Sequence, residues 1–244
     1  MTRYQAVSLS GGKDSTAMLL MMLERGERVD EVVVCDTGME FPQMYEHLGK
    51  LEKHVGIPFT RLRSDHGFEW WMYEKERTTG DYAGKVRGYG WARPRARWCT
   101  AYLKTKVIDR HFRELAKDRE VVQCVGIAAD EAWRAKDKRY PLIEWGVTEA
   151  EALAYCRERG FDWGGLYDIF SRVSCWCCPL QPIGELRKLR RHFPDLWRRL
   201  LDMDERAWND FRIGCPARKL EERFALEDRQ MRLELADRRQ NADR

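Results

Sequence analysis

The stretch that decides the fold is Tyr4-Gln5-Ala6-Val7-Ser8-Leu9-Ser10-Gly11-Gly12-Lys13-Asp14-Ser15. Its first half, up to Leu9, has the composition of a buried strand. Two glycines then allow a tight turn, and residues 14–25 have the broad apolar face of a helix. At such a junction, backbone N–H groups and the positive end of the helix dipole face an anion. The sequence therefore predicts a phosphate-binding turn after the first strand.

The side chains of this turn favour the same function. Ser10 and Ser15 offer hydroxyl groups, and Lys13 offers an ammonium group. Asp14 is suited to cap the helix or to help hold a magnesium ion. The alternative interpretation is a plain strand–turn–helix connection with a good N-cap. Because four polar groups converge on one turn, we prefer the phosphate site.

The rest of the first 140 residues alternates between strands and helices. We expect strands at 31–35, 58–62 and 120–127, and helices at 41–54 and 99–117. This alternation predicts an α/β fold with a parallel sheet and helices on both faces. The carboxyl ends of the strands would then form one ligand-binding edge.

The predicted secondary structure changes after residue 140. Helical segments dominate from there on, and a cysteine-rich stretch interrupts them. We therefore expect a nucleotide-binding α/β domain at 1–140 and a mainly helical, cysteine-containing region at 141–244.

Four segments resemble known families. The turn resembles the PP-loop of ATP pyrophosphatases, Ser-Gly-Gly-x-Asp-Ser. Three later segments resemble the phosphoadenosine phosphosulfate (PAPS) reductase family: Cys-Asp-Thr-Gly within residues 34–42, Arg-Trp-Cys-Thr-Ala-Tyr-Leu-Lys at 97–104, and Gly-Ile-Ala-Ala-Asp-Glu-Ala-Trp-Arg at 126–134. Their consistent order implies an adenine nucleotide α-hydrolase-like fold.

This resemblance implies that the chain binds ATP with Mg²⁺. The implied ATP-binding residues are Ser8, Ser10, Gly11, Gly12, Lys13, Asp14, Ser15, Asp36, Thr37, Gly126, Asp130, Glu131 and Arg134. Of these, Lys13, Asp14 and Arg134 are implied to be catalytic. Structural alternatives exist: Asp36 as a turn residue, and Asp130 with Arg134 as an ordinary helix pair.

Eight cysteines fall into two groups. Three lie in apolar runs, where packing is the default role: Cys35, Cys124 and Cys156. Residues 175–179 contain a Cys-x-x-Cys, a spacing that lets two thiolates face one metal. Cys99 opens a predicted helix, and Cys215 lies in a turn. The second group is therefore a candidate metal site.

The family resemblance implies which metal group these cysteines bind. Adenosine phosphosulfate (APS) reductases and DNA phosphorothioation enzymes are similar in their cysteine spacing, which implies a [4Fe–4S] cluster. The reductases have adjacent cysteines where this chain has Trp98 and Cys99, so we expect Cys215 to supply the missing ligand. The predicted ligands are Cys99, Cys175, Cys178 and Cys215. Structural Zn²⁺ is the alternative, and Cys177 is a spare or substitute ligand.

A long loop at 78–98 is rich in glycine, basic residues and aromatic rings. The net charge of the 244-residue chain is only +4, which excludes a uniformly basic coat. Nucleic-acid contacts must then come from local patches. The candidate acceptor-binding residues are Lys85, Arg87, Arg93, Arg95 and Arg97. A second basic run, at 187–192, we expect to be a solvated helix face.

The composition of the chain indicates the cellular compartment in which we expect the protein. It is 43% hydrophobic, enough for a packed core, and its longest apolar run, residues 17–23, is too short to span a bilayer. The glycine turn near the start leaves no room for a signal peptide. We therefore expect a cytoplasmic protein, whose cysteines serve metal binding or catalysis rather than disulfides.

Together these features predict an ATP pyrophosphatase that adenylates a nucleic-acid phosphate or base for sulfur insertion, as in DNA phosphorothioation. The expected partners are nucleic acid and a cysteine desulfurase or another sulfur donor. Alternatives are a PAPS or APS sulfonucleotide reductase, a transfer-RNA thiolation enzyme and an inactive nucleotide-binding subunit. Thioredoxin-dependent reductases use a C-terminal Glu-Cys-Gly-Leu-His nucleophile. Since no cysteine follows Cys215, we prefer sulfur transfer.

Overall fold

The computed structural model describes residues 3–242, with side chains described up to residue 235. The chain forms two compact units. The sheet unit comprises the chain up to Phe68 together with Trp98–Trp176, and the helical unit comprises Glu69–Arg97 and the chain from Cys177 onward. Consecutive segments therefore alternate between the units.

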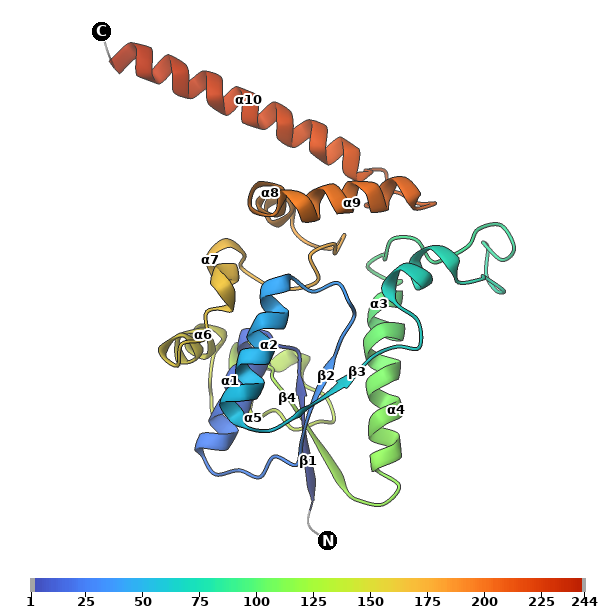
Figure 1. Ribbon diagram of the computed structural model, residues 1–244, viewed down its shortest axis with the longest axis vertical. Helices are drawn as coiled ribbons and strands as arrows, with labels where there is room; N and C mark the ends of the chain where they lie inside the picture. The colour runs from blue at the N-terminus through green and yellow to red at the C-terminus, as the bar shows by residue number, and fades with distance from the viewer. Residues whose placement is uncertain (1–2, 243–244) are drawn as a thin grey trace. The chain divides into compact units, whose positions relative to one another are not determined.

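The sheet unit is built on four parallel strands: β1 (Tyr4–Leu9), β2 (Glu31–Cys35), β3 (Phe59–Leu62) and β4 (Val121–Val125). Their order is β3-β2-β1-β4 (Figure 1). In this register, Val7 of β1 lies opposite Val32 on one side and Cys124 on the other. The predicted parallel sheet is confirmed, with both central strands at their expected bounds.

Helices flank this sheet. They are α1 (Lys13–Glu24), α2 (Pro42–Val55), α3 (Trp98–Thr100), η2 (Ala101–Thr105), α4 (Lys106–Leu115), η3 (Ala129–Arg134), α5 (Pro141–Glu144), α6 (Glu149–Glu158), η4 (Trp163–Gly165) and α7 (Leu166–Ile169). Figure 1 shows α1 and α2 on one side of the sheet and α4 on the other. The side chains of Met18, Leu19 and Met22 on α1 are fully buried, as are those of Ala6 and Val7 on β1. Burial of these apolar surfaces stabilises the layered arrangement.

The helical unit contains η1 (Trp70–Glu74), α8 (Ile183–His192), α9 (Pro194–Arg206) and α10 (Ala217–Ala242). The loop that follows η1 is anchored in its core by Trp91, which is 1% exposed. The Trp91 ring meets Phe211 edge-on at 4.9 Å, and its indole N–H donates to Asp204 at 2.8 Å. No described helix of the chain is long and apolar enough to cross a membrane.

The compact units differ from the division into 1–140 and 141–244 that the change in predicted secondary structure suggested. Helices α5, α6 and α7 belong to the sheet unit, and residues 69–97 belong to the helical unit. The physical reason is long-range packing: α6 packs along α1, a contact that a change of composition along the chain does not reveal.

Candidate functional site

The turn between β1 and α1 needs glycine at two closely packed points. Gly11 has φ +80°, and a Cβ there would lie 2.7 Å from Sδ of Met44. Gly126, just after β4, approaches the start of α1, and a Cβ there would lie 2.6 Å from the backbone N of Ser15. Larger residues would therefore displace the turn.

Hydrogen-bond donors gather at this turn. The hydroxyl oxygens of Ser10 and Ser15 lie 3.0 Å apart, and the N–H of Gly12 donates to Ser10 Oγ at 3.4 Å. Within the described part of the chain, the N–H groups of Asp14 and Ser15 have no hydrogen-bond acceptor. Backbone N–H groups of this kind, at the positive end of a helix, suit phosphate oxygens.

Lys13 is held among carboxylates. Its side chain is almost buried, and its ammonium donates to both oxygens of Asp14, at 3.0 and 3.1 Å, and to Glu149 at 2.5 Å. Burial lowers the pKa of Lys13, but its hydrogen bonds to Glu149 and Asp14 outweigh burial, so the pKa lies above its ordinary value. Burial also raises the pKa of Asp14, against the effect of the ammonium. The site therefore carries a fixed positive charge beside two carboxylates.

Two aromatic side chains from η4 and α7 fix the backbone of the turn. The indole N–H of Trp163 donates to the Gly11 carbonyl at 2.7 Å, and the Tyr167 hydroxyl accepts from the Lys13 N–H at 3.0 Å. Trp163 itself has φ +55°, a left-handed backbone that is unfavourable for a bulky residue. Sequence reasoning missed both residues and also Glu149, although the sequence Trp163-Gly164-Gly165 marks an unusual turn.

His47 lies behind this aromatic support. Its ring stacks on Trp163 at 4.5 Å, and its Nε2 lies 3.0 Å from the Thr16 hydroxyl. Burial lowers the pKa of His47 to about 4. The imidazole is therefore neutral near pH 7 and packs as part of the support.

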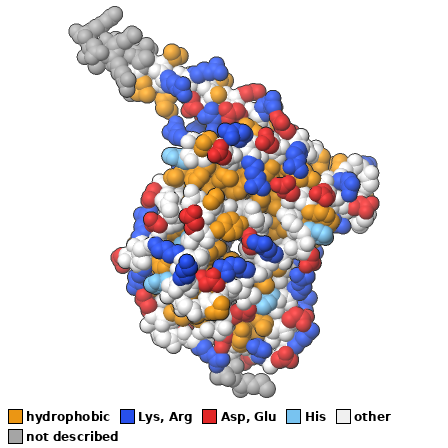
Figure 2. All heavy atoms as spheres, viewed as in Figure 1, with side chains coloured by type: hydrophobic (Ala, Val, Ile, Leu, Met, Phe, Trp, Pro, Cys, Tyr) orange, Lys and Arg blue, Asp and Glu red, His pale blue; other side chains and the backbone are white. Residues whose placement is uncertain are grey.

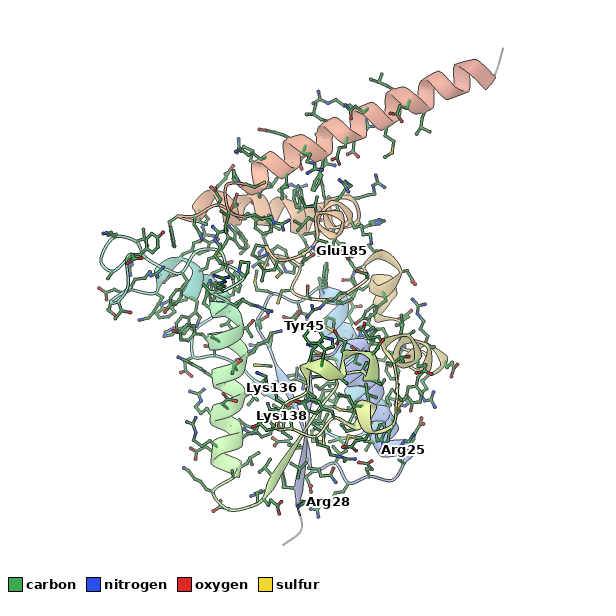
Figure 3. The ribbon with its side chains drawn as sticks, turned by 180° about the vertical axis from the view of Figure 1, so that it is seen from behind. Arg25, Arg28, Tyr45, Lys136, Lys138 and Glu185 are labelled. Atoms are coloured by element: carbon green, nitrogen blue, oxygen red, sulfur yellow. The ribbon has the colours of Figure 1, made fainter. Side chains whose placement is uncertain are left out.

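Asp36 follows β2 and is fully engaged. It accepts hydrogen bonds from the Gly38 N–H at 2.8 Å, from Tyr45 at 3.0 Å and from Arg63 at 2.9 and 2.5 Å. Figure 3 labels Tyr45 on α2. Burial raises the pKa of Asp36, but the Gly38 N–H, Arg63 and Tyr45 hold it below its ordinary value. The hydrogen bond to Gly38 is the contact expected if Asp36 is a turn residue. A role of Asp36 in nucleotide binding stays a prediction.

The other predicted nucleotide residues form contacts of their own. Thr37 Oγ1 donates to Glu40, and Ser8 accepts from Gln123 across β1 and β4. Asp130 accepts from the N–H of Glu149 at 3.1 Å. Arg134 pairs with Glu131 rather than with Asp130, because this segment is a 3₁₀-helix.

Cys175 also faces this edge of the sheet unit. Its sulfur lies 3.5 Å from Glu40 Oε1 and 3.9 Å from Thr37 Oγ1. The Lys104 ammonium donates to the same Glu40 oxygen at 3.1 Å. Burial lowers the pKa of Lys104, but the charges of Glu40 and Cys175 outweigh burial and raise it. Lys104 and Glu40 therefore form an ion pair beside Cys175.

Three cysteines behave as packing residues. Burial raises the pKa of the Cys35 and Cys124 thiols to about 11 and that of Cys156 to about 12. Thiols with such values stay protonated near pH 7, as is usual for packing residues. This result agrees with the role expected from their apolar surroundings.

The predicted metal ligands are divided between the units. Cys99 and Cys175 belong to the sheet unit, Cys178 and Cys215 belong to the helical unit, and all four are half-buried. Among the described residues, no three Cys, His, Asp or Glu side chains form a ready metal site. The four-cysteine site therefore stays a prediction.

The predicted acceptor-binding residues lie in the helical unit. Lys85 and Arg87 are exposed on residues 76–87, a segment closed by a bridge between Glu76 and Arg87 and called the hairpin below. Arg93 instead donates to the carbonyls of Asp210 and Phe211, at 3.0 and 3.5 Å. The last two predicted residues, Arg95 and Arg97, are exposed.

Comparison with known proteins gives one family. Residues 5–181 match the family described as the phosphoadenosine phosphosulfate reductase domain. Two uncharacterized proteins of Methanocaldococcus jannaschii are similar in sequence. MJ0066 is 30% identical over 206 residues, which cover 78% of this chain and 39% of that protein. MJ0973 is 25% identical over 220 residues, which cover 83% of this chain and 48% of that protein. The chain thus spans less than half the length of either relative.

Two solved structures are also similar. The PAPS reductase from Candida auris, in a phosphate complex, has a TM-score of 0.52 at 16% identity, covering 72% of this chain and 83% of that one. It shares the fold. The U34-tRNA thiolase NcsA from Methanococcus maripaludis, with its [4Fe-4S] cluster, has a TM-score of 0.42 at 16% identity, covering 82% and 68%. This second likeness is slight.

Proposed function

Because the chain belongs to the phosphoadenosine phosphosulfate reductase domain family, we propose that it is an ATP pyrophosphatase that adenylates an acceptor for sulfur insertion. The acceptor is a nucleic-acid phosphate or base, as in DNA phosphorothioation. The observation that carries this proposal is the turn after β1, where two hydroxyl groups, unbonded N–H groups and the Lys13 ammonium converge. This donor set is complementary to a polyphosphate.

In this reaction an acceptor oxygen attacks the α-phosphorus of ATP, and the bond to the pyrophosphate oxygen breaks. The terminal sulfur of a persulfide, supplied by a cysteine desulfurase or another donor, then attacks the adenylated acceptor and displaces AMP, and a thiol reductant cleaves the resulting disulfide bond to release the thiolated acceptor. The N–H groups of Asp14 and Ser15 bind phosphate oxygens. Lys13 exchanges a carboxylate partner for phosphate and balances the negative charge that grows on the leaving pyrophosphate. The support from Trp163 keeps the turn in place during this exchange.

A second set of residues completes the proposed nucleotide site. The segments after β2 and β4 supply it, with Asp36 and Thr37 beside the nucleotide and Gly126, Asp130, Glu131 and Arg134 on the far side of the phosphates. The carboxylate of Asp14 is an oxygen donor of the type that Mg²⁺ prefers, so this residue would hold the ion together with the phosphates. The ion would neutralise charge on the departing group.

The cysteines fit a thiolate-held group by their chemistry. We assign Cys99, Cys175, Cys178 and Cys215 as ligands of a [4Fe–4S] cluster, with Zn²⁺ as the alternative metal. Two of these cysteines belong to each unit. With four cysteine ligands such a cluster would supply structural and electrostatic stabilisation, and with three it would supply an iron able to bind sulfide.

The test of the ATP site is the double variant Lys13→Ala with Asp14→Ala. Pyrophosphate release from ATP, measured with acceptor and sulfur donor present, should fall by about 100-fold or more, since Lys13 stabilises negative charge in the transition state and Asp14 would hold the Mg²⁺ that does the same. The matched control is Glu114→Ala with Lys117→Ala, an exposed ion pair on and just after α4, which should keep the wild-type rate. Circular dichroism should show both proteins folded. Wild-type release by the double variant, or ADP as the product, would contradict the proposal.

The cluster has its own test. Anaerobic purification followed by iron, sulfide and zinc analysis and an ultraviolet–visible spectrum should show iron and sulfide. Replacing each of the four cysteines by Ser should remove the metal. The matched control is Cys124→Ser, at a buried packing thiol, which should keep it. Full metal content in all four single variants would remove the assignment.

A further inference from the structure

The hairpin lines a half-open cavity of about 400 Å³ in the helical unit, which the ATP site does not involve. Its lining consists of Glu76, Arg77, Gly84, Lys85, Val86 and Arg87. Backbone bonds hold this shape: the Gly84 N–H donates to the Arg77 carbonyl at 3.0 Å, and the Lys85 N–H donates to Tyr82 at 3.1 Å. The cavity is therefore built by an ordered turn.

The charges around this cavity are not balanced. Three cations line it against one carboxylate, that of Glu76. In the part of the chain that the structure describes, none of the three cations forms an ion pair; Arg87 donates only to the carbonyl of Glu74, at 3.4 Å. Unbalanced cations around a hollow attract an anion, because they lack a partner within the fold.

Aromatic rings adjoin the same cations. The Arg77 guanidinium lies 5.2 Å from the ring centres of Tyr82 and Tyr89 and 5.9 Å from that of Trp208. Tyr82 packs on Trp208 with ring centres 4.8 Å apart, yet the two residues remain 44% and 37% exposed. The Trp208 indole N–H donates to the Gly88 carbonyl at 3.3 Å, which fixes the ring beside the hairpin. The result is a partly exposed aromatic cluster beside a cationic cavity.

We infer that this hairpin cavity is a binding site for single-stranded nucleic acid. Backbone phosphates contact Lys85 and Arg87, and an unstacked base packs on the exposed face of Tyr82. A duplex fits less well, because its bases are already stacked and offer no face to the tyrosine. The inference rests on the proposed function, because it takes the acceptor to be nucleic acid. It adds that the acceptor is bound as a single strand and that the hairpin cavity binds it.

The experiment measures binding of the full chain, without ATP, to a fluorescent oligonucleotide of about 12 nucleotides, a length in the range of single-strand sites. Parallel arms use single-stranded DNA, single-stranded RNA and the DNA duplex of the same length. A single strand should bind at least about tenfold more tightly than the duplex. The preference between DNA and RNA identifies the source of the strand, and either preference supports the inference.

Variants separate the two kinds of contact. Lys85→Ala with Arg87→Ala should weaken binding about tenfold or more and reduce the slope of log affinity against log salt by about 1.4, since each single-strand phosphate contact contributes about 0.7. Tyr82→Leu should weaken binding about fivefold or more with the slope unchanged, because stacking releases no counterions. The control, Lys188→Ala with Arg191→Ala, removes the same charge from α8 and should change affinity less than about twofold.

Three results would overturn the inference: no binding of a single strand, equal affinity for the duplex, or equal losses in the hairpin and control variants. Because ATP is absent, a failure here leaves the pyrophosphate test untouched. Loss of pyrophosphate chemistry with intact strand binding would count against the proposed function alone.

Discussion

Two basic regions of the helical unit are alike in composition and opposite in electrostatic state. Each Lys and Arg side chain of the run on α8 is paired with carboxylates: Arg187 with Glu227, Lys188 with Glu185, Arg190 with Glu221 and Asp228, and Arg191 with Asp228. The three cations that line the hairpin cavity, in contrast, form no ion pair with any described residue. Figure 2 shows the consequence for α10, where blue and red side chains are interspersed. A run of cations therefore indicates a binding surface only where the fold leaves the charges unbalanced.

The two regions also differ in what holds them. Backbone bonds and close packing fix the hairpin: the Gly88 N–H donates to Lys75, and the Gly90 N–H donates to Met72. Side-chain ion pairs with α10 fix the α8 run. This contrast predicts different responses to mutation, salt and acid.

The largest expected effect is that of Gly88→Ala. Gly88 has φ +69°, and a Cβ would lie 2.0 Å from the Met72 carbonyl oxygen. We expect a loss on the order of 2–4 kcal/mol in unfolding free energy, measured by urea denaturation, together with loss of oligonucleotide binding. The matched control is Gly80→Ala, at φ +80° with open space around it, which should cost about 1 kcal/mol. Equal losses for both variants would show that the hairpin is not closely anchored.

Next in size is Arg190→Met on α8. Arg190 bonds Glu221 at 2.8 and 3.0 Å and Asp228 at 2.6 Å, so its loss leaves Glu221 without a cation and Asp228 with only Arg191, at 3.8 Å. We expect about 2 kcal/mol of destabilisation in the same measurement. Arg191→Met should cost less than about 0.5 kcal/mol, since that side chain is 56% exposed and 3.8 Å from its partner. A small loss of unfolding free energy in Arg190→Met would show that ion pairs do not hold the basic run of α8 in place.

Acid should sharpen the contrast further. The Arg190 hydrogen bonds hold the pKa of Glu221 and of Asp228 below their ordinary values. Their stabilisation is then complete above the unfolded-state pKa values of about 4 and is lost as pH falls through the lower folded-state values. Urea denaturation between pH 6 and pH 3 should show a steeper loss of stability in the wild type than in Arg190→Met. Parallel curves would mean that Arg190 does not set these pKa values.

The smallest expected effect is that of Lys85→Ala with Arg87→Ala on stability. Both side chains are exposed and neither forms an ion pair within the described residues, so unfolding free energy should change by less than about 0.5 kcal/mol. Urea denaturation tests this directly. A loss as large as that of Arg190→Met would show that these cations serve the fold rather than a ligand.

The sequence predicted the sheet well because parallel strands are buried on both faces and appear as short apolar runs. Both β1 and β2 were predicted at their observed bounds, and the end of the 99–117 helix was misplaced by two residues. The glycine turn could also be predicted, because its residues are adjacent in sequence and glycine is required for its tight backbone.

What escaped prediction depends on distant contacts. Trp163 and Tyr167 support the turn from more than 140 residues away, and no local pattern links them to it. Arg93 has the same composition signal as Arg87, but its guanidinium bonds carbonyls near residue 210. The sequence shows which residues carry charge, whereas the tertiary structure determines which charges are already used.

The alternation of the chain between units sets an order on its biosynthesis. The segment Glu69–Arg97 leaves the ribosome long before Asp204, Asn209 and Phe211, which anchor its Trp91. The sheet unit likewise needs Trp163 and Tyr167 to secure its phosphate turn. During translation, the face of Trp91 that is buried in the folded protein therefore stays exposed while more than 100 further residues are made, and exposed apolar surface of this kind favours aggregation.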